Sequence, residues 1–299
     1  MSSPPPEDHR RISSTDAHPR RRVDVLDSSI SYVDVGRGTP VVFLHGTPTW
    51  SYLWRNVIPH VAPIARCLAP DLVGMGESGN APGGSYRFVD HARYLDAWFE
   101  ALQLTGVVLA LHDWGSALGF WWAARHPERV RGIAYMEALV SPLSWTEWPE
   151  NLRKLWALLR SPAGEAAVLE QNIFVERLLP AGVLRTLSDE EMQAYRRPWL
   201  RAGEERRPLL QWPREVPFDG EPADVAAIVA GYERWLAESA TPKLFINADP
   251  GAVLVGAQRE RCRRWPNQRE VTVPGRHFVQ EDSPGAVGEV VAQFVRTLG

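Results

Sequence analysis

The stretch LALHDWGSALGF, residues 109–120, places an aspartate between an apolar run and a segment of small residues. The apolar run VVLALH, which begins at Val107, has the composition of a buried strand. The segment GSALGFWWAARHP that follows has the pattern of a helix that ends at Pro127. This order is typical of a sharp strand-to-helix turn that displays a nucleophile. A hydroxyl or a thiol is usual at such a turn, whereas this chain has the carboxylate of Asp113.

Short apolar runs alternate with helical patterns along the rest of the chain. The strand candidates are residues 23–26, 30–35, 40–45, 65–70, 107–112, 130–136, 243–247 and 270–273. Helical patterns include residues 88–102, 115–127 and 284–298. The later strand candidates are apolar without alternation, which is typical of strands covered on both faces. We therefore predict an α/β fold with an eight-stranded, mostly parallel sheet and helices on both faces.

The alternation stops between about Leu139 and Pro213. This segment has helical patterns and many prolines but no strand pattern, and it carries five tryptophans: Trp145, Trp148, Trp156, Trp199 and Trp212. Open α/β sheets bind ligands beyond the carboxyl ends of their strands, so we interpret residues 139–213 as a helical cap over that edge. The core then comprises residues 23–138 and 214–299. An apolar cap in this position would enclose a dry pocket.

The composition is that of a globular protein, with 299 residues, 44% of them hydrophobic and 23% charged. A net charge of -3 predicts no basic face, so nucleic acid is not expected as a partner. No apolar run approaches the roughly 18 residues that span a membrane, so no membrane partner is expected. Cys67 and Cys262 lie far apart and are predicted to be free thiols. The histidines lack metal-ligand spacing, so neither a metal nor a cofactor is expected.

Residues 1–22 are polar, proline-rich and charged, and we expect them to form a disordered tail. Arginines occur here as Arg10-Arg11 and again at residues 20–22. An export signal would need an apolar stretch next, and the chain continues with a strand-like alternation instead. The predicted location is therefore the cytoplasm.

Asp113, Glu137 and His277 each come directly after a strand candidate or its turn. Because the carboxyl ends of parallel strands lie at one edge of a sheet, these three side chains can converge. His277 is the only histidine after His126, which makes it the candidate for a catalytic base late in the chain. Asp249 also follows a strand candidate and is an alternative to Glu137 as the acid that supports the base.

A carboxylate at the nucleophile position indicates attack on a saturated carbon. A serine would form an ether there, which is a dead end, whereas a carboxylate forms an ester that water can cleave. We predict that Asp113 displaces a leaving group and that His277 activates the water that hydrolyses the ester. Glu137 would orient His277 and balance its charge.

The leaving group decides the substrate class. An alkoxide or an amine would need a proton, whereas a halide needs only weak N–H donors in an apolar pocket. The indole N–H of Trp114 is such a donor, because it has no acceptor capacity. For the ester step, the backbone N–H groups of Trp114 and Thr47 are the predicted donors to the developing oxyanion.

From about Val23 onward the chain resembles the haloalkane dehalogenases of the α/β-hydrolase fold. The resemblance rests on long blocks in the right order: HGTPTWSYLWRNVIPHVAP from His45, DLVGMGESG from Asp71, HDWGSALGF from His112, MEALVSPLSWTEWPE from Met136, RRPLLQWPRE from Arg206, FINADPGA from Phe245 and HFVQEDSP from His277. It implies that a small halogenated hydrocarbon and water yield an alcohol and a halide ion through an aspartyl ester, without a cofactor.

The resemblance also assigns roles to residues. It implies Asp113 as nucleophile, His277 as base, Glu137 as acid and Trp114 as a halide donor, in the subgroup whose acid follows the sixth strand. It further suggests five residues at the pocket or its entrance: Trp156, Phe174, Pro213, Val253 and Phe278. Gly182 is also expected near the entrance.

The chain departs from the family pattern at two positions. The second halide donor in that subgroup is usually an asparagine two residues after the equivalent of His45, and here it is Thr47. Either the Thr47 hydroxyl still donates to the halide or another group has replaced it. The position two residues before the nucleophile usually holds a small residue, and here it holds Leu111.

Other functions fit parts of the pattern. Epoxide hydrolases also use an aspartate at this turn, but they meet the alkoxide with cap tyrosines, and the predicted cap holds only Tyr195. Coelenterazine-oxidising luciferases share the scaffold and a similar triad, so the motifs do not separate them from dehalogenases. A receptor without catalysis is a third class, against which the complete triad argues. The GMGESG segment, residues 74–79, is predicted to be a loop and not a dinucleotide site.

Overall fold

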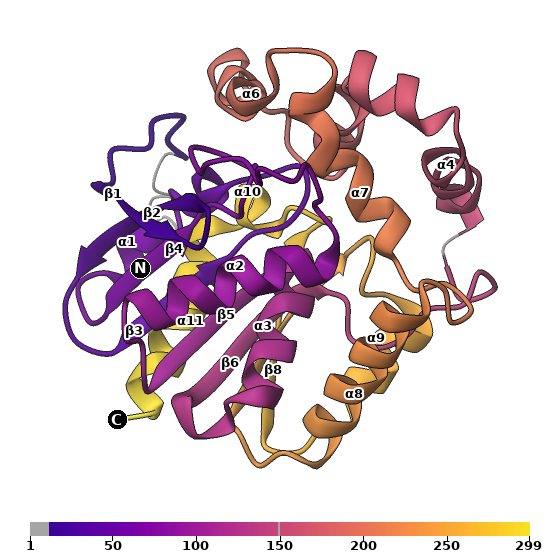
Figure 1. Cartoon of the computed structure of the whole chain (residues 1–299). Helices are drawn as coiled ribbons and strands as arrows, with labels where there is room; N and C mark the ends of the chain where they lie inside the picture. The colour runs from indigo at the N-terminus through magenta and orange to yellow at the C-terminus, as the bar shows by residue number, and fades with distance from the viewer. Residues whose placement is uncertain (1–11, 149) are drawn as a thin grey trace, which may run out of the picture.

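A twisted eight-stranded sheet forms the centre of the molecule in the computed structural model, which describes residues 12–148 and 150–299 (Figure 1). The strands are β1 (Arg20–Val25), β2 (Ser28–Gly36), β3 (Pro40–Leu44), β4 (Arg66–Pro70), β5 (Val107–Asp113), β6 (Val130–Ala138), β7 (Lys243–Pro250) and β8 (Gln268–Gly275). Their order is β1-β2-β4-β3-β5-β6-β7-β8. Strand β2 is antiparallel to both of its neighbours, and the other pairs are parallel. The predicted mostly parallel sheet is confirmed.

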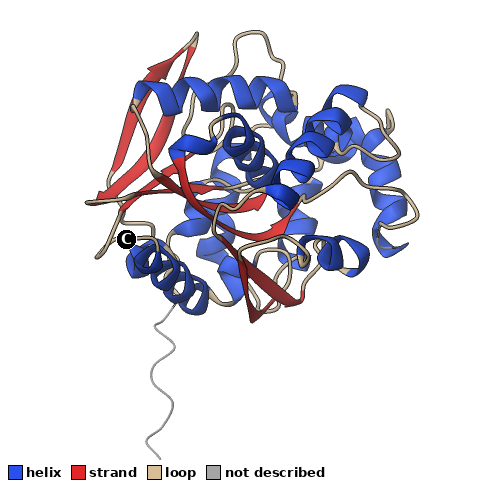
Figure 2. Ribbon diagram, turned by 90° about the horizontal axis from the view of Figure 1, so that it is seen from below, coloured by secondary structure: helices blue, strands red, loops and turns tan. Residues whose placement is uncertain are grey.

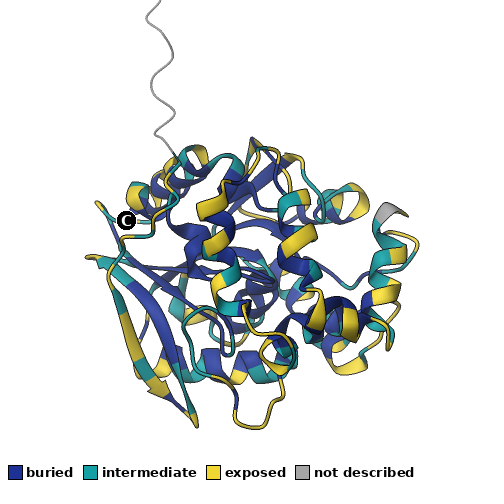
Figure 3. Cartoon of the chain, turned by 90° about the horizontal axis from the view of Figure 1, so that it is seen from above, coloured by how far each residue is buried: buried dark blue, intermediate teal, exposed yellow. Residues whose placement is uncertain are grey.

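Helices cover both faces of this sheet (Figure 2). The helices of the described residues are α1 (Ile58–Val61), α2 (Phe88–Ala101), α3 (Trp114–Arg125), α4 (Glu150–Arg160), α5 (Leu179–Ala181), α6 (Asp189–Arg196), α7 (Arg207–Glu215), α8 (Ala223–Glu238), α9 (Gly256–Cys262), α10 (Val279–Asp282) and α11 (Pro284–Thr297). Helix α3 packs against α2, α8 and the central strands, while α11 packs against α1 and the strands β6–β8. Between these two layers the sheet is buried (Figure 3).

Strand β5 illustrates why the sequence folds in this way. Its residues from Val107 to Leu111 are fully buried, because helices lie on both sides of the strand. An alternating pattern would leave polar side chains in an apolar layer, so a continuous apolar run is required here.

The turn after β5 depends on tight packing around Asp113. Asp113 has a φ of +49°, a left-handed value that is strained for any residue other than glycine. A Cβ at Gly115 would lie 2.4 Å from the backbone oxygen of His45, so only glycine fits there. A Cβ at Gly119 would lie 2.4 Å from a methyl group of Leu111. Gly119 therefore makes room for Leu111, which accounts for the large residue two positions before Asp113.

The prediction of a disordered tail is wrong for residues 12–22, which the structure describes. Residues 1–11 lie outside the described residues. Strand β1 begins at Arg20, three residues before the predicted boundary, and pairs with β2 at the edge of the sheet. Upstream of it, the Ser13 amide donates to the Asn56 side chain at 3.0 Å. An edge strand needs backbone pairing on one side only, and Arg20 forms an ion pair with the buried Asp71, so charged residues are compatible with a strand here.

Residues 139–213 contain helices α4 to α6, most of α7, which continues to Glu215, and two short π-helical turns at Ala166–Glu170 and Phe174–Leu178. Figure 1 shows α4, α6 and α7 together at one end of the sheet. Residues near the start of this segment contact residues that follow its end. The Asp219 amide donates to the Leu143 backbone oxygen at 2.8 Å, and the rings of Trp145 and Phe218 stack at 4.0 Å. We call this junction the neck.

The predictions for residues 74–79 and for the two cysteines are confirmed. Residues 74–79 form a loop, and Cys67 and Cys262 are free and buried, as predicted. None of the described helices has the length and apolar character needed to cross a membrane.

Candidate active site

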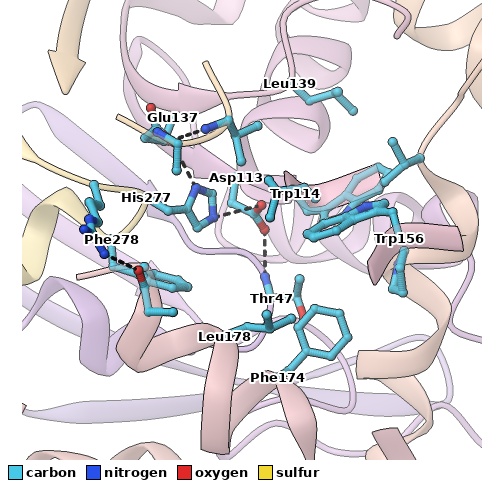
Figure 4. Close-up of a pocket in the computed structure, with 18 of the residues that line it drawn as sticks. Thr47, Asp113, Trp114, Glu137, Leu139, Trp156, Phe174, Leu178, His277 and Phe278 are labelled. Atoms are coloured by element: carbon cyan, nitrogen blue, oxygen red, sulfur yellow. Dashed lines mark hydrogen bonds and ion pairs between the residues drawn. The ribbon is translucent and has the colours of Figure 1, made fainter. Parts of the chain in front are cut away.

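Asp113, Glu137 and His277 meet at the carboxyl ends of β5, β6 and β8 (Figure 4). His277 lies between the two carboxylates. Its Nε2 is 3.3 Å from Asp113 Oδ2, and its Nδ1 is 3.3 Å from Glu137 Oε2. The imidazole can therefore exchange a proton on the Asp113 side while Glu137 holds the opposite nitrogen.

The Asp113 carboxylate is held by backbone donors. The Thr47 amide donates to Asp113 Oδ1 at 2.8 Å, and the Trp114 amide is a further donor. Gly46 lies so close that a Cβ there would be 1.9 Å from Oδ1. Burial alone would raise the pKa of the Asp113 carboxyl, but hydrogen bonding and charge from His277 outweigh it and lower that pKa. The carboxylate is thus ionised and held in a fixed position.

Glu137 is the carboxylate that supports His277. Its side chain is 1% exposed, and Oε2 accepts hydrogen bonds from the amides of Ala252 at 3.0 Å and Val253 at 2.7 Å. These two backbone donors were not predicted, because almost every residue has a backbone amide and the sequence does not indicate which amides will face a carboxylate. Asp249, the alternative acid, is exposed near the end of β7.

The electrostatics of the two histidines differ. Burial alone would lower the pKa of His277, but its hydrogen bonds to Asp113 and Glu137 raise that pKa to about 9. Burial lowers the pKa of the neighbouring His112 to about 3, so its ring is neutral. Its Nε2 donates to the backbone oxygen of His277 at 2.8 Å. His112 therefore supports the loop that carries His277 without competing for its proton.

A cavity of about 590 Å³ opens above Asp113. Its wall includes all five residues suggested by the resemblance (Trp156, Phe174, Pro213, Val253 and Phe278) and also Gly182. Sequence reasoning missed other wall residues: Pro48, Leu139, Leu143, Trp148, Leu152, Leu178, Ala181, Val216, Gly251, Ala252, Val255 and Arg276. Most of these are apolar residues whose pattern is the same whether they pack in a core or face a cavity.

Trp114 and Thr47 also line this cavity. The Trp114 indole stacks on Trp212 with ring centroids 4.7 Å apart and lies 5.9 Å from Phe88, which fixes its orientation. The Thr47 hydroxyl is buried and has no hydrogen-bond partner among the described residues. A buried hydroxyl without a hydrogen-bond partner costs free energy, so binding of a ligand atom that accepts a hydrogen bond from it would be favoured.

Comparison with known proteins agrees with this geometry. The sequence pattern of the alpha/beta hydrolase fold family matches residues 39–284, so the chain belongs to this class, in agreement with its fold and site. The chain is 54% identical over 283 residues to a haloalkane dehalogenase of Sphingobium indicum (93% of this chain, 96% of the relative) and 52% identical over 281 residues to one of Mycolicibacterium smegmatis (92% and 90%). It matches the crystal structure of haloalkane dehalogenase DbeA from Bradyrhizobium elkani with a TM-score of 0.90 and 42% identity (94% and 98% covered). Within the α/β hydrolases, this chain belongs to the haloalkane dehalogenases.

Proposed function

We propose that this enzyme hydrolyses haloalkanes through a covalent ester on Asp113. The proposal rests mainly on one observation. An ionised carboxylate faces an apolar cavity, and the imidazole that could activate water for its ester lies 3.3 Å away. The reactants are a small halogenated hydrocarbon and water, and the products are an alcohol, a halide ion and a proton.

In the first step, Asp113 Oδ2 attacks the carbon that bears the halogen, and the carbon–halogen bond breaks with its electron pair leaving on the halide. Oδ1, which accepts the Thr47 amide, becomes the carbonyl oxygen of the ester. The Trp114 indole N–H stabilises the departing halide, because it donates without accepting. Apolar walls strengthen this interaction by excluding water.

In the second step, His277 acts as the base. Esterification removes the negative charge of Asp113, so the pKa of His277 falls and the imidazolium releases its Nε2 proton to solvent. The neutral Nε2 can then take a proton from the attacking water. The hydroxide adds to the carboxyl carbon, and the Thr47 and Trp114 amides stabilise the oxyanion. Collapse of this intermediate releases the alcohol, which takes the proton from His277, and the carboxyl group left on Asp113 gives its proton to solvent to restore the carboxylate. Glu137, at the end of β6, holds the imidazolium in place, and its position supports membership of the subgroup with the acid after the sixth strand.

We also propose that the Thr47 hydroxyl is the second halide donor. Its support is the missing partner of that hydroxyl inside the cavity wall. A threonine offers one proton where an amide offers two, so Thr47→Asn is expected to tighten halide binding. Bromide binding measured by quenching of tryptophan fluorescence tests this, and unchanged affinity would contradict it.

Residues 139–213 are proposed to act as the cap, and residues 23–138 and 214–299 as the core that holds the triad. Both parts contribute to the cavity wall, which supports this division. The alternatives are less well supported, since none of the described wall residues is a tyrosine and the Tyr195 hydroxyl is bonded to Glu281. A cytoplasmic location stays a prediction of the sequence, and fractionation of cells that make the protein would test it.

The experiment that tests the ester is a single turnover of 1-bromobutane in heavy-oxygen water. Water attacks the carboxyl carbon, so label is expected in the Asp113 side chain and not in the first butanol released. Mass spectrometry of the Asp113 peptide measures it, and Asp113→Ala is the control that releases no bromide. Label found only in the butanol would mean direct attack by water and would overturn the proposal. Light emission with coelenterazine or faster turnover of an epoxide would favour the alternatives.

A further inference from the structure

The loop that carries His277 is attached to the segment around α5. On one side of His277, the Arg276 guanidinium donates to the Ala181 backbone oxygen at 3.0 Å. On the other side, the Phe278 amide donates to the Gly182 backbone oxygen at 3.0 Å. Both neighbours of His277 are therefore bonded to Ala181 and Gly182, which also line the cavity.

Asp282, the last residue of α10, joins the same two segments with its carboxylate. Its Oδ1 accepts the amides of Leu184 at 2.7 Å and Arg185 at 3.3 Å. Its Oδ2 accepts the amide of Arg276 at 2.9 Å. One oxygen thus holds the segment after α5, and the other holds the residue immediately before His277.

His277 depends on this attachment because its own hydrogen bonds are long. Both contacts to the carboxylates of Asp113 and Glu137 are 3.3 Å, beyond the usual range for a nitrogen donor and an oxygen acceptor. A displacement of about 0.5 Å at the loop is enough to lose productive geometry. The bond from His112 to the His277 backbone oxygen fixes the loop on the core side but not on the side of Asp282.

We propose that Asp282 is a positioning residue that keeps His277 in line for ester hydrolysis by tying its loop to residues 184–185. This rests on the proposed role of His277 as the base. Asp282 touches neither the substrate nor the reacting atoms. Because attack by Asp113 needs no base and hydrolysis does, loss of Asp282 slows the second step selectively.

The fold survives this loss, because Arg185 has independent contacts. Its Nε donates to the Glu281 backbone oxygen at 2.6 Å, and Nη2 pairs with the buried Glu281 carboxylate at 2.6 Å. Glu281 is in turn paired with the buried Arg55. The segment after α5 therefore stays docked when Asp282 is replaced. The Arg276 amide loses its carboxylate acceptor, and the loop is then held to this segment by the Arg276 guanidinium and the Phe278 amide.

The test is rapid-quench kinetics with 1-bromobutane on Asp282→Asn and Asp282→Ala. Bromide is expected to appear in a burst at nearly the wild-type rate, followed by butanol release slowed about 10- to 100-fold. The ester should accumulate on the Asp113 peptide in mass spectra. The matched control is Asp96→Asn, which breaks a carboxylate–arginine pair between α2 and the far end of α3, with distances of 2.7 and 2.8 Å. It should behave as the wild type.

Equal slowing of bromide burst and butanol release, or wild-type kinetics in both Asp282 variants, would overturn the proposal. His277→Gln in the same assay separates this failure from that of the proposed function. If His277→Gln accumulates the ester and Asp282→Asn does not, only the role of Asp282 is wrong. If no variant forms an ester on Asp113, the proposed function itself fails.

Discussion

The turn at Asp113 and the wall of the cavity are held by different forces. At the turn, the Asp113 side chain fills the space beside Gly46, backbone atoms fill the space beside Gly115, and an amide holds the carboxylate. The wall near Trp156 and Phe174 consists of apolar side chains that contact one another by dispersion alone, partly on a π-helical turn. Side chains can repack around a small change in volume, whereas backbone atoms in a strained turn cannot.

This difference separates chemistry from selectivity. Under the proposed function, residues of the turn carry the chemical step and residues of the wall select the substrate. Changes at the turn and at the loop of His277 should therefore act on turnover, and changes in the wall should act on preference among substrates.

The largest effect is expected when the base is removed. His277→Gln should lower steady-state turnover by about 10²- to 10⁴-fold, since general base catalysis of the second step is lost. The first step should persist, so one bromide per site should still be released. Bromide and butanol release measured together test this. His126→Gln, at the far end of α3, is the control, and equal loss of both steps in His277→Gln would contradict the expectation.

Replacing one glycine in each region by alanine compares the turn with the cavity wall directly. Gly115→Ala places Cβ against backbone oxygens at 2.4 and 2.5 Å, and we expect it to lower the free energy of unfolding by about 1–3 kcal/mol or to prevent folding. Gly182→Ala places Cβ 2.7 Å from the Phe278 ring, which can shift. It should cost less stability and change the relative kcat/KM for short and long bromoalkanes. Urea unfolding and kinetics test both, and a larger stability loss in Gly182→Ala would reverse the comparison.

The smallest effect concerns pH. The pKa of His277 is raised to about 9 in the fold, above its value of about 6.5 in an unfolded chain. Its contribution to stability is therefore complete below pH 6.5 and is lost as pH rises through 9. Asp113 and Glu137 face His277 and supply this stabilisation. Urea unfolding of the wild type and His277→Gln between about pH 6 and pH 10 should show a difference that shrinks with rising pH. A constant difference would contradict the assignment.

Much of the fold could be predicted because its strands are covered on both faces. A fully buried strand such as β5 requires an uninterrupted apolar run, and such a run is visible in a sequence. The triad residues follow strands whose carboxyl ends meet, so their convergence could be predicted as well. The predicted start of strand β1 lies three residues too far along the chain, because a charged edge strand has no apolar pattern. Its charge is compatible with a strand because Arg20 pairs with the carboxylate of Asp71.

The rest of the site could not be predicted for two physical reasons. The amides of Ala252 and Val253 hold Glu137 through backbone atoms, which every residue possesses. Trp148, Leu152 and Leu178 line the cavity with the same apolar surface that would serve in a core. Only the three-dimensional arrangement separates these two uses.

The neck has a consequence for how such enzymes diversify. Leu143 and Asp219 bring both ends of the intervening chain to one point, and Trp145 with Phe218 seals it. A stretch that leaves and re-enters at a single junction can change in length or sequence without shifting the strands beneath it, as long as residues 181–185 keep their bonds to the His277 loop and to Asp282. Variation elsewhere in the stretch can therefore supply new substrate ranges while His277 keeps its position.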